Sequence, residues 1–62
     1  MDKKAREQLD AVMDARLFLT KAGDELHTYL QKRRHGTSHS LEETKGYIHE
    51  AKLCIDRLEE LR

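Results

Sequence analysis

The chain has 62 residues, and its 12 Lys and Arg balance its 12 Asp and Glu. A chain of this size forms at most one domain, and its own core rarely contributes more than about 3–5 kcal/mol to folding. The balanced charge excludes a protein-wide field that attracts nucleic acid or anionic lipid, and the single cysteine excludes an internal disulfide. We therefore expect one domain, residues 1–62, stabilised by another chain.

The apolar residues are spaced as in helices and form no long run. No stretch of consecutive apolar residues approaches the ~18 residues that a membrane span requires. No hydrophobic signal-peptide region follows Met1. The lack of a membrane-spanning run and of a signal-peptide region, together with the one unpaired thiol on Cys54, predicts a cytoplasmic protein without a membrane partner. The periodic pattern and the absence of proline indicate an ordered all-α fold.

The first predicted helix covers residues 2–34, with Asp2 as its N-cap. One heptad-like seam has alternating spacings of four and three, which is typical of the inner contact of a left-handed bundle. Its members are Ala5, Leu9, Val12, Arg16, Leu19, Gly23, Leu26 and Leu30. A second stripe beside it contains Ala11, Ala15, Phe18, Ala22 and Tyr29. The two stripes together cover close to half of the helix circumference, at about 100° per residue.

A loop over residues 35–40 is the one strong break in the helical pattern. The last turn before it carries Lys32, Arg33 and Arg34, which favour a helix C-terminus, and Gly36 suits the left-handed conformation that ends many helices. Ser40 is a good N-cap for a second helix, with Glu43 placed to complete a capping box.

The second predicted helix covers residues 41–61 and lies antiparallel to the first, because the connection is short. Its seam consists of Leu41, Thr44, Ile48, Ala51, Ile55 and Leu58, flanked by Tyr47, Cys54 and Leu61. Since this helix is the shorter one, we expect it to leave Leu9, Val12 and Met13 near or beyond its end. The predicted fold is a two-helix antiparallel hairpin.

Each helix has a wider apolar surface than one neighbour can cover, which predicts that two hairpins pair into a four-helix bundle. The residues expected at the self-association or partner interface are Leu9, Val12, Met13, Arg16, Leu17, Phe18, Tyr29, Tyr47, Cys54 and Leu61. Arg16 interrupts the inner seam and either extends to solvent or forms an inter-chain salt bridge, for example to Glu50 or Glu59. Gly23 suggests close approach of a neighbouring backbone or of Tyr47.

The sequence shows no pattern of catalytic residues, no cofactor motif and no metal-ligand cluster. His27, His35, His39 and His49 lack ligand spacing, and Cys54 lies on an apolar flank, where it is expected to be structural. The function predicted is a non-enzymatic protein–protein interaction module, a regulator, adaptor or inhibitor acting as a homodimer. The alternative is nucleic-acid binding through the basic helix end, at Lys32, Arg33, Arg34 and His35.

Overall fold

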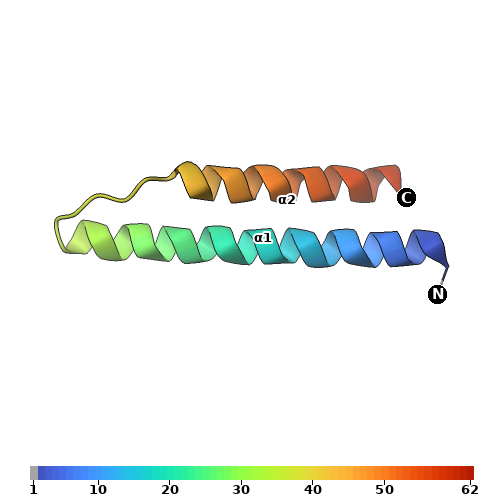
Figure 1. The fold of residues 1–62 in the computed structure, drawn as a ribbon, viewed down its shortest axis with the longest axis horizontal. Coiled ribbons are helices and arrows are strands. Elements are labelled where there is room, and N and C mark those ends of the chain that lie inside the picture. The colour runs from blue at the N-terminus through green and yellow to red at the C-terminus, as the bar shows by residue number, and fades with distance from the viewer. Residues whose placement is uncertain (1) are drawn as a thin grey trace.

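Two helices, α1 (Lys3–Arg34) and α2 (Glu42–Glu60), lie antiparallel in the computed structural model, which describes residues 2–62 (Figure 1). The Cα trace measures 51 × 16 × 11 Å, with both chain termini at the same end. The predicted all-α helical hairpin is confirmed. Met1, with which the predicted domain begins, lies outside the described residues.

The ends of α1 are fixed by local hydrogen bonds. Asp2 Oδ1 accepts a bond from the backbone N–H of Ala5 at 2.7 Å, so Asp2 is the predicted N-cap. At the other end Gly36 adopts φ 75°, and the N–H groups of Gly36 and Thr37 donate to the carbonyls of Arg33 and Lys32. These two bonds form a Schellman motif, which satisfies carbonyls that the helix end leaves without partners.

Helix α2 begins at Glu42, one residue later than predicted, with Leu41 at the cap position. Ser40 still contributes to the start of the helix, because its Oγ accepts a hydrogen bond from the N–H of Glu42 at 3.1 Å. No reciprocal bond from Glu43 closes a capping box within residues 2–62. Glu42 and Glu43 lie in the first turn, where negative charge is favourable.

Small residues form the contact between the two helices. The buried side chains of residues 2–62 are Ala11, Ala15, Ala22, Thr44 and Ala51. Beside them the rings of Phe18 and Tyr47 stack with centroids 6.4 Å apart. Small side chains let two helix backbones approach closely, so the alanine stripe of α1 is the side that packs on α2.

This arrangement corrects the prediction that the leucine-rich seam is the inner contact. The seam residues of α1 are exposed, except for half-buried Ala5, and none of the large apolar side chains in residues 2–62 is fully buried. At about 100° per residue the seam lies roughly a quarter-turn from the alanine stripe. The hairpin therefore buries the stripe with small side chains and exposes the one with large side chains.

Leu9 lies near the end of α2, but the expectation that Leu9, Val12 and Met13 form an overhang beyond that end is wrong. The end of α2 reaches the start of α1, where Gln8 Nε2 donates to the Leu61 carbonyl at 3.0 Å. The reason is that residues 37–41 are not helical and run back along α1. At ~3.3 Å per extended residue against ~1.5 Å per helical residue, five such residues pass about ten residues of α1.

The loop is held on α1 by specific contacts. His39 Nε2 lies 2.8 Å from Glu25 Oε2, and His39 Nδ1 lies 3.3 Å from Lys32 Nζ. Thr37 bonds to the Lys32 carbonyl through both its backbone N–H and its hydroxyl. These contacts determine where α2 begins along α1, and so which residues of the two helices lie opposite each other.

Candidate functional site: an exposed leucine face

The main surface feature of the hairpin is a row of aliphatic side chains shared by both helices. We call it the leucine face. Each member is between 38 and 50% exposed, namely Leu9, Val12, Leu19, Leu26, Leu30, Leu41, Ile48 and Ile55. Monomeric proteins rarely expose a contiguous apolar patch of this kind unless it binds something.

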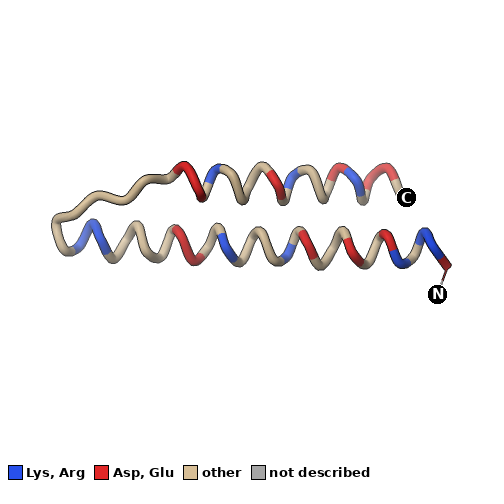
Figure 2. Tube along the Cα trace, viewed as in Figure 1, with Lys and Arg blue, Asp and Glu red and all other residues tan. Residues whose placement is uncertain are grey.

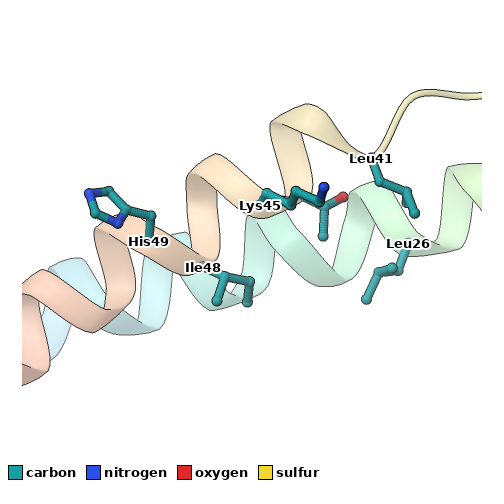
Figure 3. A pocket seen from close by; sticks show the side chains of 6 residues that line it. Leu26, Leu41, Lys45, Ile48 and His49 are labelled. Carbon is teal, nitrogen blue, oxygen red and sulfur yellow. The ribbon is translucent and has the colours of Figure 1, made fainter.

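A shallow groove shows that both helices contribute to the same face. Leu26 of α1 lies together with Leu41 and Ile48 at the junction between the helices (Figure 3), and the buried Thr44 is also among the lining residues. The groove encloses about 360 Å³ and is lined also by Lys45 and His49. The surface of the groove is almost entirely apolar.

Of the ten predicted interface residues, Leu9, Val12 and Arg16 belong to the exposed seam of α1. Met13 and Leu17 are also exposed, at 58 and 51%, but lie on another side of α1, where they line a separate shallow groove. The structure therefore places the predicted residues on at least two surfaces rather than one.

The remaining five predicted interface residues are half-buried: Phe18, Tyr29, Tyr47, Cys54 and Leu61. The hairpin itself covers part of each. Tyr47 stacks on Phe18 and lies under the ammonium group of Lys21, 5.7 Å from the ring centroid. Because they are half-buried, these five side chains expose a smaller fraction of their surface than the exposed side chains of the leucine face.

Arg16 and Gly23 both lie within the exposed seam, and Arg16 also lines the groove that contains Met13 and Leu17. Arg16 is exposed, and no ion pair to it occurs within residues 2–62. A Cβ built on Gly23 would meet no atom within 4 Å, so the expected approach of Tyr47 is wrong. Gly46 is equally open, and nothing in the hairpin explains it.

The basic end of α1 is exposed. Lys32, Arg33 and Arg34 occupy the last turn, and His35 is the C-cap residue. Along the rest of both helices basic and acidic residues are interspersed (Figure 2). The basic cluster is therefore confined to one end of the molecule.

The histidines are scattered. His39 contacts Glu25 and Lys32, His27 lies 3.4 Å from Gln31 Nε2, and His49 is exposed. Within residues 2–62 no group of three or more His, Cys, Asp or Glu side chains is arranged to hold a metal ion. Over the same residues neither helix is long and apolar enough to cross a bilayer.

Six members of the leucine face are missing from the predicted interface: Leu19, Leu26, Leu30, Leu41, Ile48 and Ile55. Their regular spacing was the signal that could have identified them, but the sequence analysis assigned that spacing to the inner contact.

Comparisons of the chain with protein-family models, with curated protein sequences and with solved structures yield no match.

Proposed function

We propose that the chain is a non-enzymatic interaction module that forms a homodimeric four-helix bundle through its leucine face. The observation that carries this proposal is that the eight largest aliphatic side chains of that face remain 38 to 50% exposed in the hairpin. A second hairpin packed face to face would bury these side chains. A four-helix bundle is a common way for helical hairpins to bury their exposed apolar faces. Aliphatic side chains offer no nucleophile, acid or base, which favours binding over catalysis.

The size of the face is compatible with a stable dimer. From Leu9 to Leu30 it extends about 30 Å along α1, and two adjacent helices are about 18 Å wide. The projected area is thus roughly 550 Å² per copy, and the accessible area is larger because side chains protrude. Two copies would bury an area near the lower end of the roughly 1,200–2,000 Å² typical of specific interfaces.

In such a bundle the outer surfaces of the helices stay available to another protein. The patch of Met13 and Leu17 lies apart from the leucine face and is the apolar surface we propose for an external partner. The module would act as a regulator, adaptor or inhibitor by presenting this patch twice. The unpaired thiol of Cys54 favours a reducing compartment such as the cytoplasm.

The proposal is tested by comparing two aspartate variants in analytical ultracentrifugation. L26D places a charge on the leucine face, and L17D places one at an equally exposed leucine elsewhere on α1. We expect the wild-type chain and L17D to sediment as dimers at micromolar concentration and L26D to be monomeric, because an unpaired charge is costly to bury. A wild-type chain that sediments as a 7.3 kDa monomer would contradict the proposal.

Nucleic-acid binding is the second candidate function. It is supported by the exposure of Arg33, Arg34 and His35 next to Lys32 at one end of α1. Phosphate contacts need no deep site, so a cluster of this kind can bind a nucleic-acid backbone. The outcome that favours it is a mobility shift with duplex RNA or DNA that disappears in R33A/R34A.

A further inference from the structure

Gly23 is an unexplained glycine in the middle of the exposed seam. A glycine inside a helix is destabilising by about 1 kcal/mol relative to alanine. The hairpin makes no use of the space, because a Cβ at this position would meet nothing within 4 Å. The glycine is explained if the space is used by another chain that crosses α1 at this point.

Arg16 is the only charged residue of the same seam, and it lies seven residues, or two helical turns, before Gly23. The midpoint between the two falls between Leu19 and Thr20. This is also the midpoint between Leu9 and Leu30, the first and last leucines of the seam. The largest side chain of the seam and its smallest residue are therefore placed symmetrically about the centre of its leucine-containing part.

We infer that the occupant of the leucine face is a second copy in which α1 crosses α1 of the first copy antiparallel. The twofold axis would pass close to Leu19, so that Arg16 of each copy lies over Gly23 of the other. Its aliphatic stem would cross the bare backbone at Gly23, and its guanidinium group would reach water at the edge of the interface. The loops of the two hairpins would then lie at opposite ends of the bundle.

This inference rests on the proposed homodimer and specifies its arrangement. The other face-to-face arrangement, with both loops at the same end, places α1 against α2 of the second copy. Phe18 contacts Tyr47, so the next residues in each helix, Leu19 and Ile48, lie at a similar position along the long axis of the hairpin. In this arrangement Leu19 would therefore face Ile48 of the second copy. Arg16 and Gly23 would then not meet, and the glycine would stay unexplained.

Cross-linking of the full-length chain distinguishes the two arrangements. Single cysteines are introduced in a C54S background, and equimolar mixtures are treated with a short bismaleimide. We expect the mixture of L9C and L30C to give a cross-linked dimer, while either variant alone gives none, because its two copies of that cysteine lie roughly 30 Å apart. Cross-linking of L19C with I48C, and not of L9C with L30C, would overturn the inference while leaving the homodimer intact.

A residue swap provides the second test. G23R alone would bring two arginines together in each half of the interface, and we expect its dimer dissociation constant to rise at least about tenfold. The double variant R16G/G23R exchanges the two residues and restores the complementarity, so its dissociation constant should return to within about threefold of wild type. A double variant as weak as G23R would overturn the inference. A wild-type chain that does not dimerise would instead overturn the proposed function.

Discussion

Thr44 combines burial with an unsatisfied polar atom. Its side chain is 8% exposed, and its Oγ1 has no hydrogen-bond partner within residues 2–62. A buried hydroxyl without a partner costs about 1–3 kcal/mol, because the bonds it makes to water in the unfolded chain are lost.

Replacing Thr44 by valine keeps the shape of the side chain and removes the hydroxyl. We therefore expect T44V to raise the free energy of unfolding by about 1 kcal/mol. The matched control is T44S, which keeps the hydroxyl, loses the methyl group and should be less stable than wild type. Urea denaturation at one fixed protein concentration measures both, since the proposed dimerisation would make stability depend on concentration. A less stable T44V would show that the hydroxyl has a partner in the assembled protein.

Several individual residues were predictable from sequence because their roles depend on local backbone geometry. Asp2 caps α1 and Gly36 ends it, and both roles follow from neighbours within six residues. The loop contact of His39 with Glu25 was not predictable, because it depends on the path of the loop across α1. Gly23 was noticed as unusual, but the neighbour expected for it is absent from the hairpin.

At the scale of the helices, the sequence predicts the two elements to within one residue at each inner boundary. It does not determine which apolar stripe packs inside. Both stripes of α1 have helical spacing, and periodicity alone cannot rank a stripe of alanines against a stripe of leucines. The alanine stripe packs inside because its small side chains allow close approach, and the Phe18 and Tyr47 rings stack beside it.

The close approach of α1 and α2 can be tested at Ala22, which is 2% exposed. The variant A22L inserts three extra carbon atoms between the helices, and overpacking of this kind costs about 1–3 kcal/mol. We expect a corresponding loss of stability in thermal denaturation followed by circular dichroism. The control is T20L, at an exposed position of the same helix, which should change stability by less than about 0.5 kcal/mol. Equal stabilities of A22L and T20L would contradict an alanine-mediated contact.

At the scale of the whole molecule, the hairpin gathers most of its exposed large aliphatic side chains on one face. Of the eleven exposed large apolar side chains in residues 2–62, eight belong to the leucine face, where Arg16 is the charged member of the α1 seam. Acidic and basic residues are interspersed along both helices (Figure 2). Because the face spans both helices, it exists only when the loop sets α2 in register with α1. The contacts of His39 and Thr37 with α1 therefore help to build the surface that we propose for dimerisation.

The leucine face is aliphatic and the end of α1 is basic, so the two candidate functions differ in their response to salt. Burial of aliphatic side chains is not weakened by ionic strength, so the dissociation constant of the proposed homodimer should change by less than about threefold between about 50 and 200 mM NaCl. A nucleic-acid complex that uses Lys32, Arg33 and Arg34 of both copies would make about six phosphate contacts. It should lose on the order of 10³ in affinity over the same range. Fluorescence anisotropy of a labelled RNA duplex and ultracentrifugation of the protein alone measure the two responses in parallel. Self-association that weakens as steeply as the nucleic-acid complex would show that charged groups, and not the leucine face, hold the two copies together.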